Sequence, residues 1–190
     1  MKNSIEKLEF YALTPDRWAD FETLFGPHGA SSGCWCMYWR FPAGGEYSAT
    51  KGEPHRLAMH ALVDEGKEPG LIAYVNGLPA AWVAVAPRPE YPRLQTSKKL
   101  YPVDDLPVWS IPCFFIHRRY RGAHLHKPLI QAAVDYAGRH GAHCIEAYPV
   151  DVREEKSSEN LFTGLQHVFE SCGFVEVAHR GSRPIMRKAL

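Results

Sequence analysis

The segment from Cys113 to Gly141, CFFIHRRYRGAHLHKPLIQAAVDYAGRHG, has the pattern of a phosphate-binding site. An apolar strand reaches a charged turn, and the turn leads directly into an amphipathic helix. The first amide groups of a helix have no partner inside the helix, and the helix dipole adds positive charge there. This order of elements can therefore hold a phosphate, although many α/β proteins contain it without that function.

A second group of residues, Gly33 to Phe41, combines two cysteines with four large aromatic side chains, Trp35, Tyr38, Trp39 and Phe41. Flat aromatic surfaces suit the apolar body of a ligand, but they would equally cap a hydrophobic core that the loop crosses. Cys34, Cys36 and His28 lack the spacing and the second ligand pair of structural zinc sites. We therefore expect no metal site.

The elements that must position these segments alternate between strands and helices. Asn76-Gly77 between two apolar runs is a strong hairpin signal, because both central residues must take positive φ. Thr14-Pro15-Asp16 begins a helix, with Thr as N-cap and Pro at the first helical position. In chain order the patterns predict a strand at 8–13, helices from 14 and at 53–66, a hairpin at 71–86, a proline-rich loop at 87–107, a strand at 108–117, a helix to about 140, a strand at 143–148, a helix at about 160–172 and two final strands. This order predicts an α/β fold with a mixed sheet covered by helices.

The run from Phe114 through Tyr120-Arg121-Gly122 into the helix resembles motif A of the GNAT N-acetyltransferases. A second resemblance lies in VFESCGFVEV, which is similar to that family's helix, Gly-Phe turn and strand. The resemblance implies a mostly antiparallel sheet that is splayed between its central strands, and acetyl-CoA as co-substrate. It implies that backbone groups of Phe114, Phe115 and Ile116 contact the pantetheine. It also implies that the pyrophosphate is bound by the residues of the following turn, Arg121, Gly122, Ala123, His124, Leu125, His126 and Lys127.

The turn departs from the family pattern at two positions. The family's two loop glycines fall on His124 and His126, and Pro128 lies in the first helical turn. A non-Gly residue at positive φ costs ~1–2 kcal/mol. A protonated imidazole ~4 Å from a phosphate could return ~4 kcal/mol at an effective dielectric of 20. We expect CoA affinity to weaken from pH ~6 to 8; the alternative is that both histidines are ordinary loop residues.

Acyl transfer to an amine requires a base, and the leaving thiolate requires a proton. GNAT members often supply the proton from a tyrosine in the last helix, where this chain has Phe169. Tyr148, at the end of the strand 143–148, is the candidate acid, and Glu146, on the same strand face, is the candidate base. The alternatives are a salt-bridged carboxylate for Glu146 and a packing role for Tyr148. The resemblance also implies that Trp35, Tyr38 and Trp39 wall the acceptor site.

Composition narrows the possible functions. The chain has 190 residues, of which 45% are hydrophobic, and its formal charge is +1, so we expect one acetyltransferase-like domain over residues 1–190 that binds neither nucleic acid nor a membrane surface. No long apolar run or signal peptide is visible, and several of the five cysteines lie in apolar runs, which predicts a cytoplasmic protein.

These observations favour an N-acyltransferase that moves an acetyl or other acyl group from acyl-CoA to a primary amine of a small molecule or peptide. We expect the protein to act as a monomer or homodimer. Two alternatives stay open. One is a GNAT-fold module that binds acyl-CoA or a partner without turnover, and the other is a small-molecule binding protein that uses the aromatic loop without CoA.

Overall fold

The computed structural model describes residues 5–150 and 162–190, and its centre is a seven-stranded sheet. The order of the strands across the sheet is β1-β2-β3-β4-β5-β7-β6, and among the neighbouring strands of the described residues only β4 and β5 run parallel to each other. The predicted mixed, mostly antiparallel sheet is therefore confirmed. The strands are β1 (Leu8–Ala12), β2 (Gly70–Val75), β3 (Leu78–Pro87), β4 (Trp109–Ile116), β5 (Cys144–Ala147), β6 (Val175–Arg180) and β7 (Arg183–Ala189).

The hairpin between β2 and β3 forms at the predicted Asn-Gly turn. Asn76 and Gly77 have φ of 51° and 79°, the left-handed values that a two-residue hairpin turn requires. Every residue of β2 is buried, and most of β3 is buried as well. These two apolar strands, covered on both faces, thus lie beside β4, the central strand, which leads to the basic turn.

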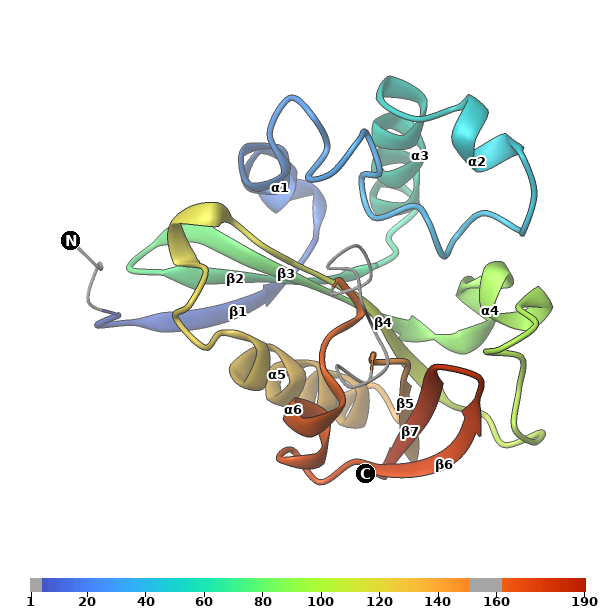
Figure 1. Ribbon diagram of the computed structural model, residues 1–190. Coiled ribbons are helices and arrows are strands. Elements are labelled where there is room, and N and C mark those ends of the chain that lie inside the picture. Colours follow the sequence, from blue (N-terminus) through green and yellow to red (C-terminus); the bar gives the residue numbers. More distant parts are fainter. Residues whose placement is uncertain (1–4, 151–161) are drawn as a thin grey trace.

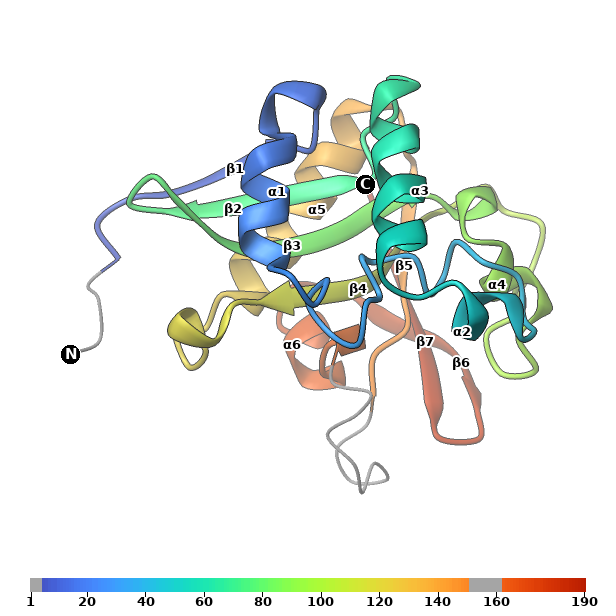
Figure 2. The ribbon, with the colours of Figure 1, turned by 90° about the horizontal axis from the view of Figure 1, so that it is seen from above.

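Helices cover both faces of this sheet (Figure 1). Trp18, Phe21 and Phe25 of α1 pack with α3 on one face, where the two helices lie side by side (Figure 2). On the other face, α5 buries Leu129 and Ala133 against the strands. The α-helices are α1 (Trp18–Phe25), α2 (Glu46–Ala49), α3 (Glu53–Asp64), α4 (Pro92–Thr96), α5 (His126–Arg139) and α6 (Gln166–Glu170), and short 3-10 turns lie at η1 (Pro15–Arg17), η2 (Arg88–Glu90) and η3 (Arg118–Tyr120).

The sheet splays between β4 and β5. Their parallel pairing covers only three positions and ends at Ile111 opposite Ala147. The pairing of β4 with β3 continues five residues further, to Ile116. Beyond Ile111, therefore, one edge of β4 has no strand beside it in the described part of the chain, as expected for this fold class.

Four segments differ from the predicted elements. Pro15–Arg17 form a 3-10 turn and the Thr14 side chain makes no capping bond, so the predicted first helix begins as an α-helix only at Trp18. The last helix is shorter than the predicted 160–172 and covers Gln166–Glu170; the predicted start at Asn160 lies outside the described residues. Gly164 has φ of 83°, and Leu165 is extended and bridges to Val150, so the chain cannot be helical there. The irregular segment from residue 26 leads into the short helix α2, and the loop at 87–107 contains the short helix α4; the few residues of these helices carry no periodic apolar pattern. No helix in the described residues has the length and apolar character needed to cross a membrane.

Candidate functional site

The free edge of β4 offers backbone groups to a ligand. The amide of His117 donates to the carbonyl oxygen of Ala80 on β3 at 3.0 Å. Successive strand residues turn their backbone groups to opposite neighbours, so those of Phe114 and Ile116 face the splay and those of Phe115 face β3. Consistent with this alternation, the Ile116 carbonyl accepts from Nε of Arg121 at 3.4 Å. Of the three predicted pantetheine contacts, the geometry therefore favours two.

The turn after β4 reaches α5 through two left-handed residues. Gly122 has φ of 78° and His124 has φ of 56°, whereas His126 is the first residue of the helix. Of the two histidines at the expected glycine positions, only His124 thus takes the conformation that favours glycine. His126 instead lies with its ring against Phe114, with the ring centroids 5.5 Å apart.

The amide groups of this turn are free to bind an anion. Five backbone N–H groups of this turn have no hydrogen-bond partner among the described residues. They belong to Gly122, His124, Leu125, His126 and Lys127. The amides of Arg121 and Ala123 are the exceptions among the predicted residues, because they donate to the carbonyl oxygens of Arg118 and Tyr120 at 3.4 and 3.2 Å. Free amides at the start of a fourteen-residue helix fit a phosphate, since the helix dipole acts in the same direction.

Positive charge surrounds the same turn. Arg118, Arg119, Arg121 and Lys127 are all exposed, and none of them pairs with a carboxylate in the described part of the chain. Burial, together with the charges of the three arginines, lowers the pKa of His117. Burial alone lowers the pKa of His126, so its imidazole is neutral at pH 7 in the free protein. The arginines and Lys127 therefore supply the positive charge near neutral pH.

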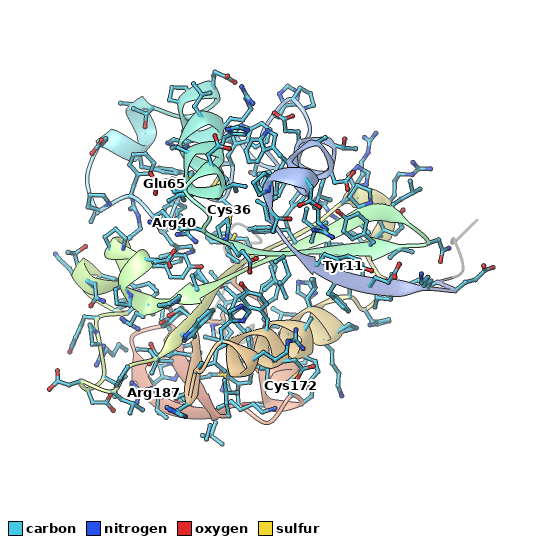
Figure 3. All side chains as sticks on the ribbon, turned by 180° about the vertical axis from the view of Figure 1, so that it is seen from behind. Tyr11, Cys36, Arg40, Glu65, Cys172 and Arg187 are labelled. Carbon is cyan, nitrogen blue, oxygen red and sulfur yellow. The ribbon has the colours of Figure 1, made fainter. Side chains whose placement is uncertain are left out.

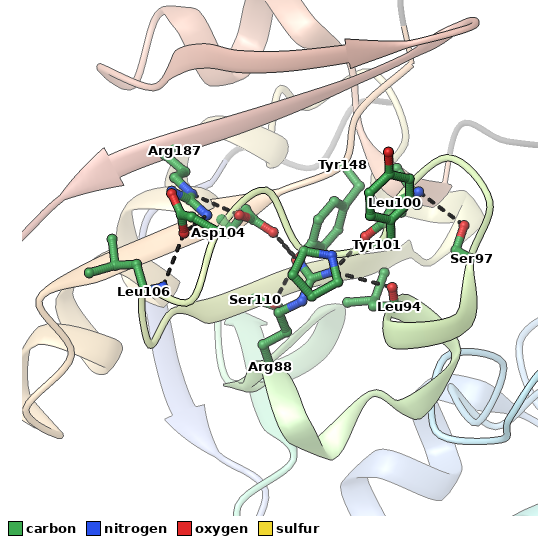
Figure 4. Close-up of polar contacts among 12 residues, drawn as sticks. Arg88, Leu94, Ser97, Leu100, Tyr101, Asp104, Leu106, Ser110, Tyr148 and Arg187 are labelled. Carbon is green, nitrogen blue, oxygen red and sulfur yellow. Dashed lines mark hydrogen bonds and ion pairs between the residues drawn. The ribbon is translucent and has the colours of Figure 1, made fainter.

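Glu146 and Tyr148 lie together, as predicted, but in a closed network. Figure 4 shows Tyr148 with Arg88, Ser110 and Arg187 of this network. The Tyr148 hydroxyl donates to Oε1 of Glu146 at 2.7 Å. Arg88 donates to both side chains, and Nε of Arg187 donates to Oε2 of Glu146 at 2.7 Å. Ser110 Oγ also lies 2.8 Å from the Tyr148 hydroxyl. The two guanidinium groups thus engage both oxygens of the carboxylate.

This burial does not support the expected roles of base and acid. Glu146 and Tyr148 are both 0% exposed, so neither reaches a ligand in the splay without rearrangement. Burial, followed by the negative charge of Glu146, raises the pKa of Tyr148 well above its ordinary value, which makes the phenol a weaker acid. The network joins β4, β5, β7 and the segment after β3, so its role is structural.

The aromatic loop divides between the core and a cleft. Trp35 is buried and stacks on Phe25, with ring centroids 5.8 Å apart, so it belongs to the core instead of the predicted acceptor wall. Its neighbours Cys36 and Arg40 lie between α3 and the strands (Figure 3). Tyr38 and Trp39 line a cleft of about 270 Å³ that we call the aromatic–basic cleft; its other principal lining residues are Phe162, Lys98, Lys99 and Arg183.

The sequence of residues 32–174 matches the family model of the acetyltransferase (GNAT) family. This match covers the aromatic loop, the splayed strand, the turn with its free amides and α6. The chain belongs to the GNAT acetyltransferase family.

Solved structures show that the fold of the whole chain is that of GNAT proteins. A GNAT acetyltransferase from Listeria monocytogenes 4b F2365 is 11% identical with a TM-score of 0.58, over 96% of this chain and 95% of that one. The PaiA N-acetyltransferase from Thermoplasma acidophilum, solved with coenzyme A, is 12% identical with a TM-score of 0.53, over 97% and 99%. A chain of the NatC complex, solved with Gag peptide and CoA, is 15% identical with a TM-score of 0.53, over 97% and 99%. No curated protein matches the sequence.

Phe169 occupies the place where GNAT members often have the acidic tyrosine. Its ring is fully buried and packs against Phe114 and Phe174, with ring centroids 6.0 and 5.1 Å away. A Cβ on Gly164 would lie only 2.9 Å from this ring, so the chain passes tightly over it. Phe169 thus fixes α6 against β4 and has no group that could donate a proton.

Sequence reasoning missed the arginines that close the Glu146 network. Arg88 lies 58 residues from Glu146 and Arg187 lies 41 residues from it, so no local pattern connects them. One signal was available, because a carboxylate in the apolar run CIEAYPV must find a cationic partner when that strand is buried. The alternation in the final strand could then have suggested Arg187, whose guanidinium also binds Asp104.

Proposed function

We propose that this GNAT protein is an N-acyltransferase that moves an acetyl or other acyl group from acyl-CoA to an amine. The observation that carries the proposal is the set of free amides in the turn from Gly122 to Lys127, at the end of a strand edge that has no neighbour. A pyrophosphate on these amides and a pantetheine along the β4 edge would follow one continuous path. The relatives solved with CoA support this use of the fold.

The residues of this chain divide the work between binding and positioning. The amides of the turn, with Arg121 and Lys127, would hold the phosphates, and the backbone of Phe114 and Ile116 would align the pantetheine. Acyl-CoA supplies an activated thioester carbonyl when it is bound. The splay then fixes where that carbonyl lies relative to the acceptor, and such positioning alone contributes several kcal/mol to acyl transfer, about 7–11 in the best cases.

The acceptor side of the proposal is the aromatic–basic cleft. Arg183, one of its lining residues, donates to the carbonyl oxygen of Tyr148 at 2.8 Å, where the chain leaves β5. An amine that is held in the cleft would therefore lie beside the splay. A small amine and the end of a peptide both fit this arrangement, and the peptide-bound NatC relative supports the second.

A binding-only module is the second candidate, and two observations favour it. Phe169 has no hydroxyl, and Tyr148, the phenol at the end of β5, is fully buried. A protein with the fold and the CoA path but without an accessible acid could bind acyl-CoA without turnover.

Two measurements test these functions in sequence. Titration calorimetry should show that CoA binds, and pantetheine should bind at least tenfold more weakly, because it lacks the nucleotide with its phosphates. An assay of free thiol from acetyl-CoA with a panel of primary amines and peptides then separates enzyme from module. Amine-dependent thiol release supports the acyltransferase, whereas CoA binding with no release across the panel leaves the module. Absence of CoA binding at millimolar concentration would overturn both.

A further inference from the structure

The aromatic–basic cleft has walls that suit a flat apolar group. The rings of Tyr38 and Trp39 meet edge to face, with centroids 4.9 Å apart, and the Phe162 ring lies 6.1 Å from Tyr38 and 6.5 Å from Trp39. The guanidinium of Arg93 lies 4.2 Å from the Tyr38 centroid and its Nε donates to the Tyr38 carbonyl at 2.6 Å. The walls are thus held in place before any ligand arrives.

A buried donor in the cleft has no partner. Trp39 is 6% exposed and lines the cleft, yet its Nε1–H has no hydrogen-bond partner in the described part of the chain. A buried N–H without a partner costs about 1–3 kcal/mol, so a ligand atom that reaches this N–H after a small shift of the Trp39 ring and accepts its hydrogen bond would gain affinity. An indole N–H donates only, and it therefore selects an acceptor atom such as a carboxylate oxygen over an ammonium.

The other polar groups of the cleft are also suited to donate. Ser97 Oγ already accepts from the amides of Lys99 and Leu100 at 3.3 and 3.1 Å, which leaves its O–H to donate. Lys98 and Lys99 are exposed at the rim, and within the described residues Lys99 Nζ makes a polar contact only to the neutral Ser182 hydroxyl, at 3.4 Å. No carboxylate lines the cleft among the described residues. Its lining therefore carries positive charge.

We propose that the aromatic–basic cleft selects acceptors that carry a carboxylate and an aromatic body in addition to the reacting amine. The rings of Tyr38, Trp39 and Phe162 contact the aromatic body. The carboxylate binds Trp39 Nε1–H and the ammonium groups of Lys98 and Lys99. This substrate class rests on the proposed acyltransferase function, and it explains why two lysines stand at the rim of an aromatic site.

A matched set of three amines tests the inference: 4-(aminomethyl)benzoate, 4-(aminomethyl)benzamide and benzylamine. The carboxylate lies far from the amine, so the three differ little in amine basicity. With acetyl-CoA as donor, the KM of the benzoate should be at least tenfold below those of the other two. Calorimetry of the benzoate with CoA-loaded protein measures the same preference without requiring turnover.

Variants assign the preference to the cleft. In the double variant Lys98→Ala, Lys99→Ala the advantage of the benzoate over benzylamine should fall at least fivefold, because the two charges that bind its carboxylate are lost. Trp39→Phe removes the indole N–H together with the five-membered ring, so it should weaken binding of the benzoate severalfold more than binding of benzylamine. Lys67→Ala, an exposed lysine paired with Glu65 elsewhere on the surface, is the matched control and should change nothing.

The outcomes separate the inference from the function on which it rests. Equal or better use of benzylamine, or full retention of the preference in the double lysine variant, would overturn the substrate class while leaving the acyltransferase intact. Benzoate binding to CoA-loaded protein that depends on Lys98, Lys99 and Trp39, but without thiol release, would support the cleft and overturn the enzyme. Circular dichroism melting of Trp39→Phe confirms that its loss of binding is not a loss of fold.

Discussion

The turn before α5 and the network around Glu146 both concentrate polar groups beside the splay, but they differ in what those groups contact. In the turn, five amides lack partners within the described part of the chain, and the cations are exposed. In the network, the carboxylate of Glu146 binds two guanidiniums and the Tyr148 hydroxyl contacts three side chains. Buried groups that are satisfied by the protein hold structure, and groups that are left open are available to a ligand.

The largest effect should come from breaking the closed network. Glu146→Gln removes the charge that pairs with Arg88 and Arg187 while keeping the shape of the side chain. Removing one partner of a buried ion pair leaves the other charge uncompensated, at a cost of about 3–5 kcal/mol. Urea unfolding should show a loss of this size.

Glu65→Gln is the matched control for this change. Glu65 and Lys67 form an exposed pair at 3.7 Å, so the free energy of unfolding should change by less than about 1 kcal/mol. If Glu146→Gln were as harmless as this control, the network would not be a scaffold, and a role of Glu146 in turnover would become the better explanation.

Tyr148→Phe makes a smaller change to the same network and separates scaffold from acid. Loss of a hydroxyl that contacts Arg88, Ser110 and Glu146 should cost about 1–3 kcal/mol of stability. We expect kcat to stay within twofold of wild type well below the melting temperature. A general acid would instead lose about 10²–10⁴ in rate.

The control for Tyr148→Phe is Tyr136→Phe on α5, whose hydroxyl donates to Glu68 on the other side of the sheet. It should lower stability by a comparable amount and leave turnover unchanged. A fall in kcat of tenfold or more in Tyr148→Phe alone would restore Tyr148 as the acid.

Two glycines at opposite ends of α5 test whether the turn with the free amides binds CoA. Gly122 and Gly141 have φ of 78° and 80°, and a Cβ added to either would meet nothing within 4 Å. Valine at either position should therefore cost a similar ~1–2 kcal/mol of stability through backbone strain. Only Gly122→Val disturbs the turn with the free amides, so only this variant should weaken CoA binding, by about tenfold. Equal CoA affinity in the two variants, measured by calorimetry, would place the pyrophosphate elsewhere.

The difference between the two regions also explains what the sequence could predict. The strand, turn and helix are consecutive in the chain, and the Asn76-Gly77 hairpin is signalled by two adjacent residues, so local patterns were enough. The contacts of the Glu146 carboxylate depend on Arg88 and Arg187, which come close to it only when the sheet has formed. Trp35 and Trp39 lie in one loop, and whether each faced core or cleft depended on packing that the sequence does not encode locally.

The smallest effect concerns pH and distinguishes His126 from the exposed charges of the turn. Burial lowers the pKa of His126 below the ~6.5 of an unfolded chain, so the unfolded state binds more protons as the pH falls through this range. The free protein should therefore lose a little stability as the pH drops below about 6.5 and show no His126 contribution above about pH 7.5. His126→Gln should remove this dependence in urea unfolding.

The lowered pKa of His126 should also affect CoA affinity, but in the opposite direction from stability: affinity should rise as the pH falls. An anion favours the imidazolium, so CoA affinity should rise only as the pH falls below about 6.5, and should be flat from pH 7 to 8, where the sequence alone suggested that it would fall. Protonation of the CoA phosphates changes the affinity of both proteins equally, so a comparison of His126→Gln with wild type at each pH removes this contribution. The exposed His124, replaced by Asn because Asn tolerates its left-handed φ of 56°, is the control for a change of imidazole in the same turn. A steady loss of affinity between pH 7 and 8 that His126→Gln abolishes would show that bound phosphate raises the pKa of His126, and would move this residue from packing to the binding site.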